Sequence, residues 1–129
     1  MKKSIILVIA LLLTVRAAYG KDLELRQEAG GYEFRVKIDR NPPILGDNHI
    51  EIEIKDGTGA RITDARVMVN YYMPPMPRMA PMSYTTRAKL KGESYRATMA
   101  IIMSGPWIIK VLATHQGKRV VTKFNVDAQ

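Results

Sequence analysis

Four methionines recur at every third position in a proline-rich stretch of the chain. Residues 73–82 read MPPMPRMAPM, which places them at Met73, Met76, Met79 and Met82. Proline removes amide donors and clashes with a preceding helical turn, so this stretch is neither a helix nor an interior strand. Because polyproline II has three residues per turn, a period of three predicts that all four thioethers share one side.

Two kinds of chemistry suit a row of thioethers. Methionine is a soft, neutral sulfur ligand that favours Cu(I). It is also a flexible apolar side chain that is used at adaptable protein-binding surfaces. In an extended polyproline II run, residues three apart are separated by about 9 Å, since the rise is about 3.1 Å per residue. Two side chains can then share one ion, whereas three can do so only if the loop bends.

Alternating apolar and polar residues predict short strands on both sides of this loop and no helix in the mature chain. The expected strands cover residues 22–27, 32–38, 49–55, 66–72, 83–91, 95–103, 107–114 and 119–126. Turn residues separate them at intervals of about eight to twelve positions. We therefore expect an all-β domain, namely an immunoglobulin-like antiparallel β-sandwich of seven to eight strands. A small barrel is the alternative.

If every connection reverses the chain, one pole of this fold gathers further residues around the methionine loop. Met103 ends one expected strand there, Trp107 begins the next, and His49 begins an earlier one. Met103 adds a thioether, His49 adds an imidazole, and the ring face of Trp107 can cap a monovalent cation. The alternatives are that Met103 and Trp107 are core residues and that His49 is a surface residue. His115 is expected at the opposite pole.

The first twenty residues have the features of a signal peptide. Lys2 and Lys3 precede an apolar run at residues 5–15, and residues 18–20 include the small residues that a signal peptidase needs. The run is short for a membrane span, which takes about 20 residues. We expect a signal peptide over residues 1–20, a single domain over residues 21–129, and export to the periplasm or the extracellular space. The alternative is an uncleaved N-terminal anchor, which is the one membrane contact that we expect.

Charge and cysteine content exclude several other classes. Lys2, Lys3 and Arg16 leave with the signal peptide, so the formal charge falls from +8 to +5. The remaining charges are mixed in sign, so we expect no nucleic-acid partner. The absence of cysteine excludes disulfides and thiolate zinc sites. We expect no enzyme activity, because no nucleophile with a base, no phosphate-binding glycine loop and no two-histidine motif is evident.

Several residues together resemble the YtkA-like domain, and the related FixH-like proteins share much of this layout. They are Gly46-Asp47-Asn48, Ile50 to Asp56 with Gly59, Asp64-Ala65 with Val67, Met73 to Met76, Tyr95, and Met103 with Gly105 and Trp107. The resemblance covers residues 31–126. It implies an exported or membrane-facing immunoglobulin-like domain associated with copper handling, heavy-metal efflux or the assembly of copper-containing respiratory oxidases. The short apolar segment makes this chain look more like a soluble secreted form than an anchored assembly factor.

The sequence therefore leads to two hypotheses for one loop. The first is an exported copper- or heavy-metal-handling accessory protein that binds Cu(I) through the methionines, with Met103, His49 and Trp107 as further candidates. A copper-handling or cell-envelope protein is its expected partner. The second is a metal-free interaction or oxidase-assembly module that docks through the same loop.

Overall fold

The computed structural model describes residues 22–129, which form eight antiparallel strands. The strands are β1 (Leu23–Ala29), β2 (Tyr32–Ile38), β3 (Gly46–Lys55), β4 (Arg66–Tyr72), β5 (Ser83–Lys91), β6 (Ser94–Ile101), β7 (Gly105–His115) and β8 (Lys118–Ala128). The expected signal peptide lies outside the described residues. Within the described part of the chain, no helix is long and apolar enough to cross a membrane.

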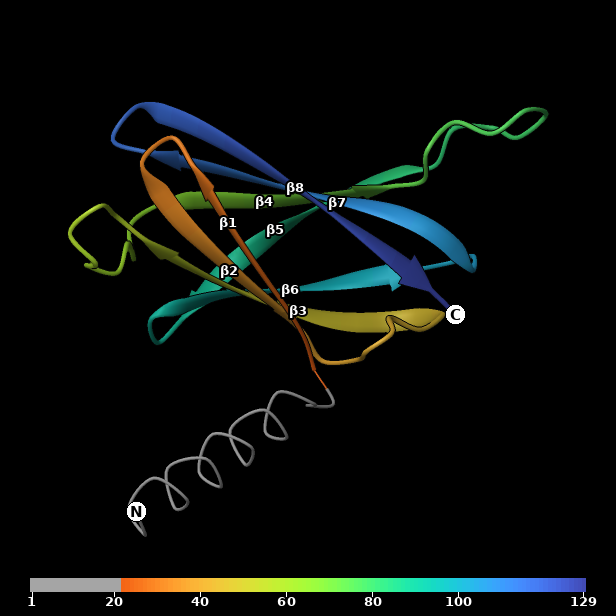
Figure 1. Ribbon diagram of the computed structural model, residues 1–129, viewed down its shortest axis with the longest axis horizontal. Coiled ribbons are helices and arrows are strands. Elements are labelled where there is room, and N and C mark those ends of the chain that lie inside the picture. Colours follow the sequence, from red (N-terminus) through yellow and green to blue (C-terminus); the bar gives the residue numbers. More distant parts are fainter. Residues whose placement is uncertain (1–21) are drawn as a thin grey trace, which may run out of the picture.

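The strands form one sheet in the order β1-β2-β3-β6-β5-β4-β7-β8, which folds over into two layers (Figure 1). Strand β5 makes the fold-over, because residues 89–91 pair with β6 whereas residues 83–88 pair with β4. Apart from β1, the order β2-β3-β6-β5 and β4-β7-β8 is that of the two sheets of an immunoglobulin domain. Strand β1 approaches β8, so the sheet is nearly closed. The all-β, antiparallel prediction is confirmed, and the structure combines features of a sandwich and a barrel.

The core lies between the two layers and follows the period-two pattern of the sequence. Ile50, Ile52 and Ile54 of β3 point inward and are at most 2% exposed. Phe34, Tyr95 and Trp107 are the largest of the fully buried aromatic side chains. Each fully buried aliphatic or aromatic side chain contributes about 1.5–3 kcal/mol, so this core stabilises a domain that has no disulfides.

The chain directions place the methionine loop where the sequence predicted. Tyr72 at the end of β4 pairs with Ser83 of β5 and with Ile108 of β7, while Ile101 at the end of β6 pairs with Gly46 of β3. The methionine loop, the start of β3 and the β6–β7 turn therefore share one pole. The expected end of β6 at Met103 was wrong. The strand ends at Ile101, and Met103 belongs to the turn, where its carbonyl accepts a hydrogen bond from Trp107 Nε1 at 2.9 Å.

Candidate metal site: a methionine groove

All four methionines of the loop line one groove of about 350 Å³, which we call the methionine groove. The other lining residues are Asn70, Tyr72, Pro74, Pro75, Ala80, Pro81 and Ser83. Met73 is buried, Met76 and Met82 are half-buried, and Met79 is 37% exposed. The thioethers therefore range from the covered base of the groove to its open rim. The loop that carries them projects beyond the ends of the strands (Figure 1).

The loop is a hairpin, which corrects the expectation of one continuous polyproline II run. The amide of Met73 donates to the carbonyl of Met82 at 3.2 Å, which extends the β4–β5 pairing by one step. The amide of Met79 donates to the carbonyl of Met76 at 3.3 Å and closes a tight turn. Pro77 sets the first turn position, and Arg78 follows with φ at +66°, as a type II turn requires. Because the chain reverses here, residues 73–76 run back against residues 79–82.

The outer side of β4 and β5 forms the floor of the groove. Asn70 Nδ2 donates to Ser83 Oγ at 3.0 Å and to the carbonyl of Tyr84 at 3.0 Å, which ties the two strands together where the loop begins. Sequence reasoning did not single out Asn70 or Ser83. They could be identified from the sequence because they occupy alternate, outward-pointing positions on the two strands that border the loop.

Gly105 at the start of β7 determines how closely Met73 packs. A Cβ added to Gly105 would lie 3.2 Å from Met73 Cε, and the φ of Gly105 is +124°. Glycine therefore supplies both the backbone conformation and the space that the methionine methyl group needs. This contact explains why a glycine lies between Met103 and Trp107.

Met103 and Trp107 lie at the same pole but do not line the methionine groove. Trp107 is 1% exposed and packs with Tyr71 and Tyr84, at ring-centroid distances of 6.1 and 6.5 Å. Met103 is half-buried against the core. Both residues therefore belong to the packing at this pole, and a ligand role for either remains a prediction.

The structure does not bring His49 to the methionines. Its imidazole lies on the outer side of β3, where Nδ1 is 3.2 Å from Thr98 Oγ1, and it lines a separate polar groove with Asp39 and Glu51. The sequence already indicated this orientation. Side chains alternate along a strand, so His49 must point outward if Ile50 points inward. No three His, Cys, Asp or Glu side chains within residues 22–129 gather as a metal-binding group. The soft donors of the groove are thioethers alone.

His115 lies at the opposite pole, as predicted, and both of its ring nitrogens have partners. Nδ1 is 3.0 Å from the Tyr32 hydroxyl, and Nε2 is 2.9 Å from Asp64 Oδ1. Its side chain is 11% exposed. These contacts tie the β7–β8 turn to β2 and to the segment before β4, so His115 serves to close the fold at this pole.

A family model supports the resemblance. The YtkA-like family matches residues 26–112, which include the whole methionine groove. The chain belongs to the YtkA-like family. No curated protein matches it. The relation to FixH-like proteins stays a prediction.

Most of the residues that carried the YtkA-like resemblance have structural roles. Asn48 is fully buried, accepts from the amide of Ile44 at 2.9 Å and donates to its carbonyl at 2.7 Å, which fixes the loop before β3. The Tyr95 hydroxyl donates to the carbonyl of Ile62 and accepts from the amide of Ala65. Burial raises the pKa of Tyr95, so this hydroxyl stays protonated as a donor. Only Met73 and Met76 of that set, with the prolines between them, line the groove.

Proposed function

We propose that this YtkA-like protein binds Cu(I) in the methionine groove and serves as an exported copper-handling accessory protein. The observation that carries the proposal is that four thioethers from one hairpin line a single groove. Thioethers are neutral soft ligands, and Cu(I) is among the ions that soft sulfur ligands select. The donor set therefore fits the ion.

The hairpin supports the proposal by removing the spacing problem of an extended run. Neighbouring methionines along a polyproline II segment are about 9 Å apart, which limits the number that can reach one ion. In the folded loop, the turn at residues 76–79 sets one arm against the other, so thioethers from both arms face a common space. Arg78 is the one charged residue between residues 71 and 86, and it occupies the turn.

The test is an anaerobic Cu(I) competition titration of the purified protein against a chromophoric chelator. We expect stoichiometric binding that is lost when Met73, Met76, Met79 and Met82 are all replaced by leucine. Leucine preserves the apolar volume, so the fold should survive. Met68→Leu is the matched control, because Met68 lies on β4 outside the groove and its replacement should leave the affinity unchanged. Equal Cu(I) binding by the fourfold leucine variant would refute the proposal.

A metal-free docking module is the second candidate, and the exposure of Met79 at the rim of an apolar groove favours it. Proline-stiffened loops lose little conformational entropy on binding, which suits such a role. The fourfold leucine variant separates the two functions. Metal binding depends on sulfur and should disappear, whereas docking depends on apolar shape and should persist.

We also propose that the protein acts after export, on the basis of the basic, apolar and small-residue segments within residues 1–20. The test is fractionation of cells that express the full chain, with N-terminal sequencing of the product. Recovery in the exported fraction with a new terminus at Lys21 is the expected result. An uncut product in the soluble cytoplasmic fraction would contradict it.

A further inference from the structure

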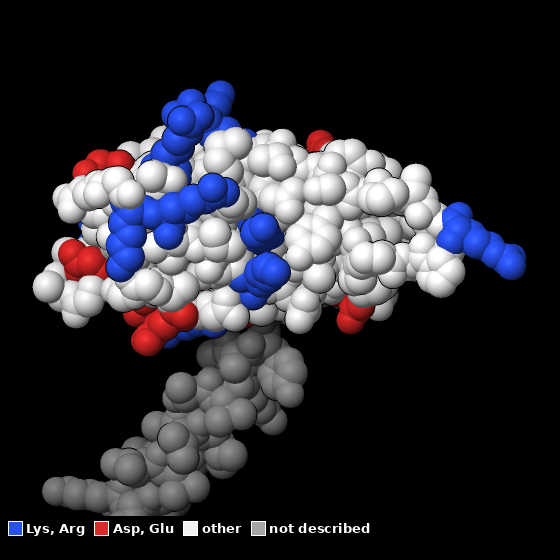
Figure 2. All heavy atoms as spheres, turned by 90° about the horizontal axis from the view of Figure 1, so that it is seen from above, with Lys and Arg blue, Asp and Glu red and all other residues white. Residues whose placement is uncertain are grey.

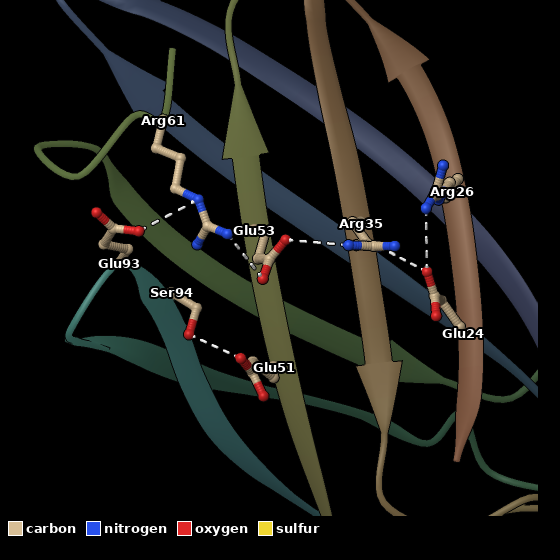
Figure 3. Close-up of polar contacts among 8 residues, drawn as sticks. All are labelled: Glu24, Arg26, Arg35, Glu51, Glu53, Arg61, Glu93 and Ser94. Carbon is tan, nitrogen blue, oxygen red and sulfur yellow. Dashed lines mark hydrogen bonds and ion pairs between the residues drawn. The ribbon is translucent and has the colours of Figure 1, made fainter. Parts of the chain in front are cut away.

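The two outer faces of the fold carry charge in different ways. On the layer containing β1, β2, β3 and β6, acidic and basic side chains alternate and pair across the strands (Figure 3). Arg35 lies 2.6 Å from Glu24 and 3.6 Å from Glu53, and Arg61 links Glu53 to Glu93 at 3.5 and 3.4 Å. The charges that belong to this network therefore neutralise one another, whereas Lys37, Lys89 and Arg96 of the same layer form no ion pair within 4.0 Å among residues 22–129.

The other outer face is formed by β4, β7, β8 and residues 83–88 of β5, and it is basic. Its outward-pointing charged side chains are five cations, Arg66, Arg87, Lys110, Arg119 and Lys123, and one carboxylate, Asp127. Among residues 22–129, none of the five cations forms an ion pair within 4.0 Å. We call these five residues the basic face. Figure 2 views the molecule from the side of this layer. Lys and Arg gather over its left half and middle, Asp and Glu lie toward its margins, and most of the right half is uncharged.

The strand register sets apolar side chains between the cations. One row across the four strands begins with Arg87 of β5 and continues through three apolar residues, Met68, Leu112 and Val121. The adjacent row runs through Thr85 and Asn70 to Lys110 and Lys123. Val121 is 38% exposed. Cationic heads therefore surround a strip of partly exposed aliphatic surface, and the face continues into the floor of the methionine groove at Asn70 and Tyr72.

We propose that the basic face docks on an anionic lipid bilayer. Its cations extend over four strands, so they match a broad negative surface. Lysine and arginine stems lie along apolar surface while their heads reach phosphate groups, which is how such side chains sit at a bilayer interface. A protein partner fits less well at Lys110 and Lys123, because lysine is depleted at the centre of protein interfaces, whereas arginine suits either partner.

Docking in this way sets the methionine groove beside the bilayer rather than away from it, since the groove floor belongs to the same outer face. Copper bound there would be held next to whatever membrane protein receives or supplies it. The docking itself does not depend on copper binding. Its failure would leave the Cu(I) titration described above unaffected, and failure of that titration would leave the docking unaffected.

The test is co-sedimentation of the full chain with vesicles of phosphatidylcholine alone or phosphatidylcholine mixed with phosphatidylglycerol. We expect binding that requires phosphatidylglycerol at about 0.1 M salt and is lost at about 1 M, where the Debye length falls from about 10 Å to about 3 Å. The variant Arg87→Gln/Lys110→Gln/Lys123→Gln should lose about fivefold in partitioning per cation removed.

The matched control removes the same charges, one arginine and two lysines, from the other outer face. Lys37→Gln/Lys89→Gln/Arg96→Gln should bind the mixed vesicles nearly as well as the unaltered protein. Urea unfolding of both triple variants checks that each is folded. Equal loss in the two variants would mean that net charge alone drives binding and would overturn the proposal. Absence of phosphatidylglycerol-dependent binding would also overturn it and would leave an acidic protein surface as the alternative occupant.

Discussion

The two poles of this domain use different chemistry. At the pole of the β7–β8 turn, polar side chains are engaged with one another: His115 with Tyr32 and Asp64, and Asp56 with the hydroxyl of Thr58 at 2.6 Å. At the other pole, the methionine loop holds four thioethers and a single charged residue, and residues 97–109 beneath it carry no charge.

The polar residues at the first pole hold the fold together, whereas, among residues 22–129, the methionine side chains at the second pole make no hydrogen bonds that a ligand would have to replace. At the polar pole, both ring nitrogens of His115 already have partners. The methionines have no strong hydrogen bonds to lose, since a thioether is only a weak acceptor. The other pole therefore holds the thioethers that we propose as ligands for Cu(I).

The largest expected effect comes from removing the support beneath the methionine loop. Trp107→Ala deletes a buried ring and its hydrogen bond to Met103, so we expect a loss of about 3–5 kcal/mol in the free energy of unfolding. Urea unfolding measures it. A loss below about 1 kcal/mol would show that this pole is not packed as described.

A smaller effect is expected at the contact between the loop and β7. Gly105→Ala forces a side chain into a positive-φ conformation and against Met73 Cε, so we expect destabilisation of about 1–3 kcal/mol. Because Met73 must shift, Cu(I) affinity should fall as well. Gly92→Ala is a useful control, because Gly92 also has positive φ but an added Cβ there meets no neighbour. Unchanged Cu(I) affinity in Gly105→Ala would show that Met73 is not a Cu(I) ligand.

At the polar pole, Tyr32→Phe removes only the hydroxyl that faces His115 Nδ1. We expect a loss of about 0.5–1.5 kcal/mol in unfolding free energy, with no change in Cu(I) affinity. Urea unfolding and the chelator titration report the two quantities on the same sample. A change in Cu(I) affinity would mean that the two poles are energetically coupled and do not act independently.

The smallest expected effect is on how the free energy of unfolding depends on pH in acid. The hydrogen bond from the Thr58 hydroxyl, together with the Thr58 amide, lowers the pKa of Asp56 below its ordinary value of 3.8. The ionised carboxylate of Asp56 therefore stabilises the folded state fully above pH 3.8, and this stabilisation is lost as the pH falls through the lowered pKa. Thr58→Val should make unfolding free energy less dependent on pH in this range, as urea titrations at descending pH would show. An unchanged pH slope would mean that this hydrogen bond has no energetic role.

Sequence reasoning predicted the strands well because alternation and turn residues are local signals. It also predicted which pole holds the methionines, since antiparallel order follows from short reversing connections. It failed for His49, where it used position along the strand and neglected which side of the strand the residue faces. It also missed the turn at Arg78, because a positive φ is unusual for a residue that is not glycine. The floor of the groove could not be predicted from local patterns, because it forms only when β4 pairs with β5.

The central claim is that copper binds to the methionines of one groove, and methyl resonances test it most directly. Selective labelling of methionine methyl groups gives separate NMR signals for the seven methionines that follow the expected signal peptide. On anaerobic addition of one equivalent of Cu(I), the signals of Met73, Met76, Met79 and Met82 should move. Those of Met68 on the outer side of β4 and Met99 in the core should not. Four unmoved groove signals, or equal movement of Met68 and Met99, would contradict the claim.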